Sequence, residues 1–350
     1  MQDTKRHPWE ALRLLLLLLA AAVLLVPALT PGVRAADDPE TRYVIPMGRA
    51  VGIKLFSEGV LVVGFTDVAT DRGPANPARD GGLKKGDVIT QLDGRAVSSI
   101  EDVQAILQTE GAKDVDLRVR RDGKEQDLTI RAVKCSADGN YKLGAWIRDS
   151  MAGIGTLTFA DPETGLFGTL GHGVNDVDTA VLLKLQSGSI TPASVAGVVK
   201  GQDGQPGELR GAFSSDEDLG TLFANTEQGV FGHLTDPGLL TGEAIPVATE
   251  DQVHIGPAAI LANVSGTEVA EYDVEILKVF DHATDTRDLM LKVTDPDLLQ
   301  QTGGIVQGMS GSPILQDGRL VGAVTHVLID HADRGYGILA RHMLERAEAG

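Results

Sequence analysis

The sequence predicts a mainly β protein, and three observations lead to this fold class. Gly supplies 42 of the 350 residues whereas aromatic residues supply only 4%, a composition typical of short strands joined by many turns. From residue 142 onward, short apolar runs alternate with Gly, Asp and Pro, and helical spacing of apolar residues returns only at 340–348. Short strands at regular spacing are typical of a sandwich or barrel, and the chain length suggests two domains.

The charge and the cysteine content exclude several classes of protein. The formal net charge of −18 argues against binding to nucleic acid or to an anionic membrane surface, since both need a basic face. Cys135 is the single cysteine, so no internal disulfide can form. The sequence has neither a Cys-x-x-Cys pair nor a His-Glu-x-x-His helix, so we expect no metal site and no cofactor.

The N-terminus has the pattern of an export signal. Lys5, Arg6 and Arg13 precede an apolar run at 14–29, which is the order of the charged and hydrophobic regions in a targeting segment. Residues 1–36 are therefore predicted to be a cleaved signal peptide or a retained membrane anchor, with Ala35 as the candidate cleavage point. The positive flank places the remainder of the chain beyond the membrane, so we expect an extracytoplasmic protein.

Residues 43–134 form the first predicted module, a small α+β domain. Ser99 is expected to cap a helix, because apolar residues follow it at helical spacing. Asp122-Gly123 separates two strand-like runs and is a strong hairpin signal. The other elements predicted here are a Gly-containing loop at 48–55 and strands at 59–65, 88–92, 115–120 and 127–133.

This order of elements resembles the PDZ domains attached to bacterial envelope proteases. The resemblance rests on Gly82-Leu83-Lys84-Lys85-Gly86-Asp87-Val88-Ile89, on the Asp93-Gly94 turn and on the helix after it. It implies a groove between a strand and a helix that accepts an extended peptide by strand addition. The backbone of Val51, Gly52 and Ile53 would receive the terminal carboxylate of that peptide. The alternative is a small β-domain that serves only as a spacer.

The stretch 302–316 has the composition of a nucleophile turn. Small residues flank Ser310 in Gly308-Met309-Ser310-Gly311-Ser312-Pro313, and they allow a tight turn that exposes its hydroxyl. The N–H groups of Gly308 and Ser310 would then converge on a developing oxyanion. A plain loop of Gly and Ser has a similar composition, so this interpretation depends on a base and an acid elsewhere in the chain.

His172 is the candidate base. It lies between glycines in Thr169-Leu170-Gly171-His172-Gly173, and an imidazole with a pKa near 6.5 is suited to removing a proton from a hydroxyl. His233, in Gly232-His233-Leu234, is the strongest rival as the base. His326 could line a substrate cleft or belong to a core.

Asp295 is the candidate acid. It follows a strand-like run and would accept the imidazole N–H, fix the tautomer and stabilise the imidazolium. A turn residue before Pro is an equally ordinary role for Asp. The other carboxylates that remain open as the acid are Asp176, Asp178, Asp281 and Asp288.

Several long motifs resemble the stage IV sporulation protein B peptidases of endospore-forming bacteria. They are Ile147-Arg148-Asp149-Ser150, the run 152–159, Leu170-Gly171-His172 with Asp176, and the stretches 302–314 and 322–327. The resemblance covers nearly the whole chain. It implies a chymotrypsin-like double β-barrel peptidase domain at 141–350, with His172, Asp295 and Ser310 as its catalytic residues.

The same resemblance implies a substrate and a compartment. Members of the family cleave themselves and a membrane-bound regulator of an intramembrane protease, which releases a mother-cell sigma factor. They act between the two membranes around the forespore. Gly173 and the strongly negative charge depart from what the family leads us to expect. Two alternatives stay open, a catalytically inactive PDZ-bearing envelope adaptor and a general quality-control protease of the envelope.

Overall fold

The computed structural model describes residues 41–213, 217–280 and 286–349. The described residues from 42 onward form one compact unit. The predicted targeting segment 1–36 and the candidate acid Asp281 lie outside the described residues. Among the helices that the structure describes, none is both long and apolar enough to cross a bilayer.

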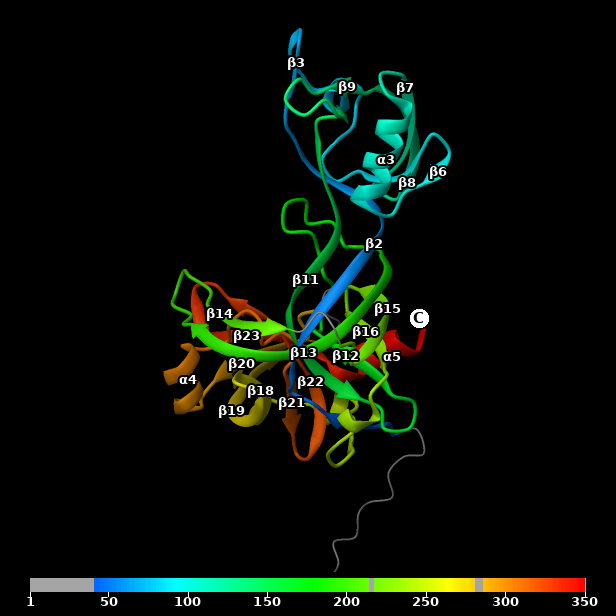
Figure 1. Ribbon diagram of the computed structural model, residues 1–350. Coiled ribbons are helices and arrows are strands. Elements are labelled where there is room, and N and C mark those ends of the chain that lie inside the picture. The colour runs from blue at the N-terminus through cyan, green and yellow to red at the C-terminus, as the bar shows by residue number, and fades with distance from the viewer. Residues whose placement is uncertain (1–40, 214–216, 281–285, 350) are drawn as a thin grey trace, which may run out of the picture. The chain divides into compact units, whose positions relative to one another are not determined.

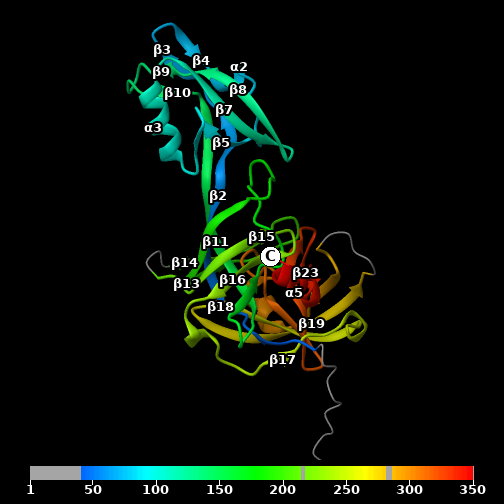
Figure 2. The ribbon, with the colours of Figure 1, turned by 90° about the vertical axis from the view of Figure 1, so that its right-hand side faces the viewer.

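Six strands form a first closed ring. Strand β2 pairs with β11 on one edge and with β13 on the other, and the strands between them complete the circuit in the order β11, β12, β16, β15, β13. Leu157, Phe167 and Ile190 belong to its core and are fully buried. Figures 1 and 2 show β2 and β11 running side by side. The strands are β2 (Ala50–Phe65), β11 (Ala145–Ala160), β12 (Leu166–Thr169), β13 (Leu185–Val199), β15 (Gly220–Thr226) and β16 (Gly229–Leu234).

Six later strands form a second closed barrel in the order β18, β19, β20, β23, β22, β21. In β19 the buried residues Tyr272, Val274 and Ile276 alternate with exposed acidic ones, because successive side chains point to opposite faces of a strand. The strands are β18 (Gly256–Ser265), β19 (Glu268–Val279), β20 (Leu289–Val293), β21 (Pro313–Gln316), β22 (Arg319–Leu328) and β23 (His331–Leu339). Two six-stranded closed units confirm the predicted chymotrypsin-like double β-barrel.

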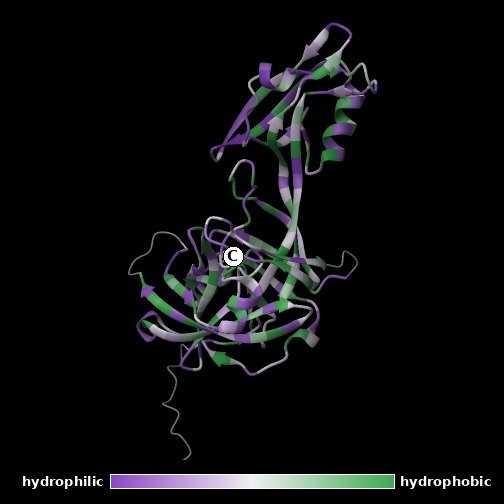
Figure 3. Ribbon diagram, turned by 90° about the vertical axis from the view of Figure 1, so that its left-hand side faces the viewer, coloured by the Kyte–Doolittle hydropathy of each residue, from purple (hydrophilic) through white to green (hydrophobic). Residues whose placement is uncertain are grey.

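The PDZ-type module is built on the second half of β2. Its sheet continues from β2 through β5 (Val88–Leu92) and β7 (Asp114–Arg121) to β8 (Lys124–Arg131). Ser99 caps helix α3 (Ile100–Glu110) and forms a capping box with Asp102, and the helix buries Val103, Ile106 and Leu107. Figure 3 shows α3 carrying both hydrophobic and hydrophilic residues, as expected of a helix packed on one face. The predicted helix and the Asp122-Gly123 hairpin are confirmed.

Shorter elements complete the described chain. The strands are β1 (Tyr43–Pro46), β3 (Val68–Thr70), β4 (Gly73–Ala75), β6 (Arg95–Ala96), β9 (Val133–Lys134), β10 (Tyr141–Lys142), β14 (Glu208–Phe213) and β17 (Ile245–Pro246). The helices are α2 (Pro77–Asp80), α4 (Pro296–Thr302) and α5 (Ala340–Ala349), with 3-10 turns η2 (Pro237–Leu239) and η3 (Glu250–Gln252).

Strand pairing connects the two predicted segments, 43–134 and 141–350. Strand β1 pairs with β11 and β17, and the first half of β2 belongs to the first ring. Conversely, the start of β11 pairs with the end of β2, through Ala145 opposite Phe65 and Arg148 opposite Leu61. Strands β2 and β11 are therefore shared between the PDZ-type sheet and the first ring.

His342 gives α5 a pH-dependent contact with Asp288, the residue before β20, and with Glu250 of η3. Its Nδ1 lies 2.8 Å from the buried Asp288 carboxylate, which raises the pKa of His342, and Nε2 lies 3.3 Å from Glu250. A raised pKa in the folded state means that the stabilisation is complete below the unfolded pKa near 6.5 and is lost as pH rises through the folded value.

We expect His342→Gln to lower the free energy of unfolding by about 1 kcal/mol near pH 6 and by less at pH 9. The figure for pH 6 is reduced for solvent screening, because the ring is partly exposed. Urea unfolding at the two pH values measures this difference. The exposed His331, changed to Gln, is the control and should show no such pH dependence. A deficit of equal size at both pH values would contradict the role of the ion pair.

Candidate active site

Loops of the two barrels meet at a pocket of about 500 Å³. Strands β2 and β11 of the first ring supply apolar walls at Ile53 and Ile154. The segment after β12 supplies His172, the segment before β21 supplies Ser310, and β22 supplies His326. The structure thus brings His172 and Ser310 into one pocket although 138 positions separate them in the sequence.

The nucleophile turn is fixed by backbone hydrogen bonds on both sides of Ser310. The N–H of Met309 donates to Val306 O at 3.1 Å, and the N–H of Gly311 donates to Val324 O at 2.7 Å. Gly308 and Gly311 have φ values of +98° and +96°, which residues with a Cβ rarely adopt. The local sequence therefore folds into the tight turn that its small residues predict.

Two further bonds attach this turn to its neighbours. The hydroxyl of Thr156 on β11 donates to Gly308 O at 2.8 Å, and the N–H of Thr156 donates to Ser310 O at 3.1 Å. The Ser310 hydroxyl itself donates to Thr325 O at 2.9 Å. The first ring therefore supports the nucleophile of the second barrel directly.

The predicted oxyanion donors are the N–H groups of Gly308 and Ser310. None of the hydrogen bonds among the described residues uses either of these two N–H groups as a donor. The N–H of Met309, which lies between them, already donates to Val306 O within the turn. Two available donors in one tight turn are what a tetrahedral oxyanion needs, although their role stays a prediction.

His172 follows two residues with left-handed backbone. Leu170 and Gly171 both have φ of +68°, and a Cβ on Gly171 would lie 2.9 Å from side-chain atoms of Thr325 and Ile338. A strained leucine held in this region is typical of functional sites. The structure also explains why a glycine occupies position 173, where the family leads us to expect a larger residue. A Cβ there would lie 2.8 Å from Thr226 O.

The ring of His172 is oriented by a backbone carbonyl. Its Nδ1 lies 2.8 Å from Gly173 O, and because a carbonyl can only accept, Nδ1 carries the proton in the neutral ring. The lone pair is then on Nε2, which is the nitrogen a base requires. Burial lowers the pKa of His172, while the Gly173 carbonyl acts in the opposite direction. The ring of His326 is 5.1 Å from it, centroid to centroid.

The structure places Asp295 away from this pocket. Its carboxylate accepts from the N–H of Leu298 at 2.8 Å and caps α4, with Pro296 at the first helical position. It does not line the pocket that holds His172 and Ser310. The structure therefore gives Asp295 a capping role, and its assignment as the acid stays a prediction.

The other candidates from the sequence also have identified contacts. Asp176 and Asp178 bind Arg148, and Asp288 binds His342. His233 lies on β16, outside the pocket, with its ring 5.4 Å from that of Phe223. His326 does line the pocket, which agrees with its predicted role as a residue of a substrate cleft.

Comparison with known families agrees with this geometry. Residues 139–344 match the family described as SpoIVB peptidase S55, and residues 68–121 match a PDZ domain. The chain belongs to the SpoIVB peptidase S55 family. It is a PDZ-bearing member of this serine peptidase family, and the predicted resemblance is confirmed.

Curated relatives of this S55 member share shorter segments. A probable periplasmic serine protease do/HhoA-like of Haemophilus influenzae is 37% identical over 73 residues, which is 21% of this chain and 15% of that protein. Zinc metalloprotease RasP of Oceanobacillus iheyensis is 24% identical over 183 residues, 51% of this chain and 42% of that protein. The chain thus spans less than half the length of these relatives.

Solved structures with similarity to this S55 member include a protease and a PDZ domain. The active form of the Rv3671c protease from M. tuberculosis is 15% identical, with 58% of this chain and 74% of that chain covered and a TM-score of 0.32. The PDZ domain of an SdrC-like protein from Listeria monocytogenes is 24% identical, with 26% and 87% covered and a TM-score of 0.22.

A second pocket of about 710 Å³ lies in the PDZ-type module of this S55 member. Its lining includes Val103 and Leu107 of α3 and Ala145 and Ile147 of β11. Within the described residues, the segment Ala145–Arg148 has a strand partner on one edge only, namely β2. A helix facing a half-paired strand is the arrangement that accepts an added strand.

Strand pairing leaves no room for a peptide at the predicted peptide-binding residues. Val51, Gly52 and Ile53 lie in β2 with β11 paired on one edge and β13 on the other, so no backbone edge is left for a peptide. A Gly followed by a strand-like run also occurs at Gly144, so the sequence carries the same signal at the open edge of β11 as at 48–55.

Proposed function

We propose that this chain is a serine endopeptidase in which Ser310 is the nucleophile and His172 is the general base. The observation that carries the proposal is that loops of two separate barrels place both residues in one pocket. Nε2 of His172 would take the hydroxyl proton while Ser310 Oγ attacks the scissile carbonyl. The N–H groups of Gly308 and Ser310 would stabilise the oxyanion by a few kcal/mol per donor.

The ground state of the structure does not yet have this geometry. The Ser310 hydroxyl donates to Thr325 O, so its O–H must turn away from this carbonyl before it can donate to His172. Hydroxyl rotation is fast, and catalytic hydrogen bonds often tighten only when substrate binds. The same observation favours the alternative of a catalytically inactive envelope adaptor, so the two must be separated by experiment.

The setting and substrate are proposed from the family and the N-terminal sequence. We infer that the chain is exported and acts during sporulation, where it would cleave itself and a membrane-bound regulator of an intramembrane protease. Membership of the SpoIVB peptidase S55 family supports this role, and the charged and apolar order of residues 5–29 supports export. The groove between α3 and β11 would hold an extended segment of a protein partner.

Labelling by a fluorophosphonate, which modifies only an activated serine, tests the peptidase against the adaptor. We expect the full chain to label, with a rate that reaches half its maximum below pH 6.5, because burial lowers the pKa of His172 and keeps the ring neutral in mild acid. Labelling from pH 4.5 to 8 measures this midpoint. Absence of labelling in the folded chain would favour the adaptor, and a midpoint above 6.5 would contradict the lowered pKa of His172.

A further inference from the structure

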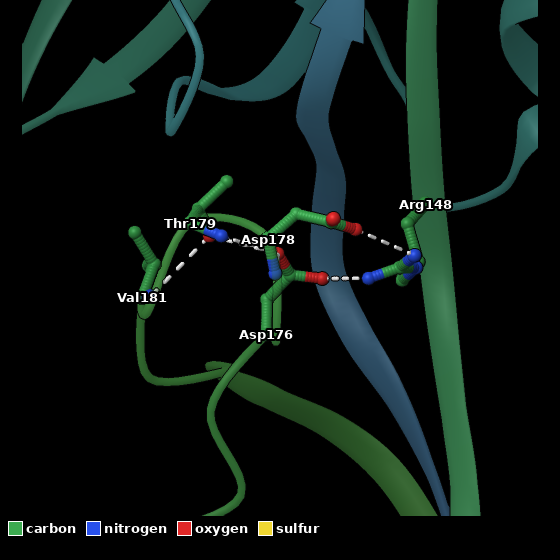
Figure 4. A network of polar contacts seen from close by, with 5 residues as sticks. All are labelled: Arg148, Asp176, Asp178, Thr179 and Val181. Atoms are coloured by element: carbon green, nitrogen blue, oxygen red, sulfur yellow. Dashed lines mark hydrogen bonds and ion pairs between the residues drawn. The ribbon is translucent and has the colours of Figure 1, made fainter.

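Arg148 of β11 lies against the loop that carries His172. Its guanidinium forms ion pairs with the carboxylates of Asp176 and Asp178, and the distance to Asp178 is 3.0 Å. Figure 4 shows both carboxylates directed at the guanidinium from the same loop. The Asp176 side chain is fully buried whereas that of Arg148 is 31% exposed. A buried carboxylate without its cation would be strongly unfavourable, so this contact constrains the loop.

Asp176 in turn shapes the loop around itself. Its Oδ1 accepts from the N–H of Asp178 at 3.0 Å and from the N–H and hydroxyl of Thr179, each at 2.9 Å. Burial alone would raise the pKa of Asp176, but Thr179 and Arg148 together hold it below its usual value. The carboxylate therefore stays charged, and it joins a turn of the loop to β11.

Asn225 of β15 holds the other side of the same loop. Its side-chain amide accepts from the N–H of Val174 at 2.9 Å and donates to Val174 O at 3.0 Å and to Leu183 O at 2.8 Å. His172 is thus two residues from one attachment and four residues from the other. The position of its imidazole relative to Ser310 depends on both attachments.

Three consecutive residues of β11 connect this loop to the PDZ-type groove. Ile147 lines the groove, Arg148 holds Asp176, and Oδ2 of Asp149 accepts from the N–H of Ile100, the first residue of α3, at 2.9 Å. Further along, β11 also lines the active-site pocket at residues 151–154. A displacement of β11 at the groove therefore acts directly on the residue that holds the catalytic loop.

We propose that Arg148 is a positioning residue that sets the loop of His172 and joins it to the groove between α3 and β11. The inference rests on the proposed peptidase function, and it predicts that the reactivity of Ser310 depends on a residue that contacts neither the nucleophile nor the base. Arg148 is suited to this role because its planar fork binds two carboxylates in a fixed geometry.

Fluorophosphonate labelling of Arg148→Met tests the first part. We expect the labelling rate to fall about tenfold or more, since a displacement of about 1 Å in a catalytic group can cost that much. Arg148→Lys should recover part of the rate, because an ammonium can pair with one carboxylate. Arg131→Met is the matched control, since it removes an exposed Arg–Asp pair on β8 and should leave the rate unchanged.

Hydrogen exchange distinguishes a positioning role from general destabilisation. In Arg148→Met the amides of residues 174–183 should exchange faster while the strands of the second barrel stay protected. If Arg148→Met does not fold, Asp178→Asn removes only the half-exposed pair and should still slow labelling severalfold. An unchanged labelling rate in a folded variant would overturn the inference but not the proposed function. The proposed function is tested separately, by labelling of the unaltered chain and by its loss in Ser310→Ala.

A bulky side chain in the groove tests the connection to α3. Gln104 is exposed and lines the groove, so Gln104→Trp should insert a ring between α3 and β11 at little cost to folding. We expect it to slow Ser310 labelling severalfold when Arg148 is present and by less than about twofold in the Arg148→Met background, as a coupled pair does in a double-mutant cycle. No effect, or an equal effect in both backgrounds, would show that the groove is not joined to the loop through Arg148.

Discussion

Ser310→Ala should abolish fluorophosphonate labelling and lower peptide hydrolysis by a factor of about 10⁴ or more. The reason is that the hydroxyl supplies the bond-forming atom, and removing one member of a nucleophile–base pair costs nearly as much as removing all of them. His172→Ala should cause a loss of similar size, and the double variant should be little worse than either single one, since the two groups act as a unit. Single-turnover hydrolysis of an unfolded protein substrate measures each rate.

Ser312→Ala is the matched control for this prediction. Ser312 lies in the same turn, its side chain is fully buried, and its hydroxyl has no hydrogen-bond partner among the described residues. Removing that hydroxyl should leave the labelling rate within about threefold and should not lower stability, because no hydrogen bond is lost. Self-cleavage or labelling that persists in Ser310→Ala would refute the assignment of the nucleophile.

Asp295→Asn separates the two roles proposed for this residue. Asn caps a helix about as well as Asp, so the variant keeps the bond to the N–H of Leu298 but loses the negative charge. Retained labelling would assign Asp295 to the cap of α4 alone. A loss comparable to that of His172→Ala would show that the carboxylate reaches the imidazole in the active enzyme.

The elements that the sequence predicted are those determined by local chemistry. Ser99 followed by apolar residues at helical spacing is sufficient for α3, and Asp122-Gly123 is sufficient for its hairpin, because cap and turn residues act on their immediate neighbours. The turn around Ser310 belongs to the same class, since Gly308 and Gly311 supply the φ values that it needs. These features require no knowledge of what the chain contacts elsewhere.

The elements that it did not predict depend on pairing between distant segments. Nothing in the residues 51–53 shows that β11 and β13 will occupy both edges of β2, because the partners come about 100 and about 140 positions later. Asp295 illustrates a second difficulty, since Asp before Pro is a helix-start signal as well as the end of a strand. The sequence marks Arg148 as part of a motif and Asp176 as a motif residue and a candidate acid, but the contact between them needs the folded loop.

Gly311→Ala should nearly eliminate Ser310 labelling and lower the free energy of unfolding by about 2–4 kcal/mol. A Cβ at this position would lie 2.1 Å from Thr156 O and 2.6 Å from the N of Leu170, and the residue has a φ of +96°. Both contacts are with backbone, which cannot rotate away as a side chain can. Relief would require the turn to separate from β11 and from the start of the His172 loop, so the nucleophile and the base would move together.

Gly318→Ala is the control that separates this clash from backbone strain. Gly318 has a φ of +71°, yet a Cβ there would meet nothing within 4 Å. Its replacement should cost about 1 kcal/mol of stability from the left-handed backbone alone, with labelling unchanged. Urea unfolding and labelling of both variants measure the difference. If Gly311→Ala were no worse than Gly318→Ala in either measurement, the close approach between the nucleophile turn, β11 and the His172 loop would not exist in the working enzyme.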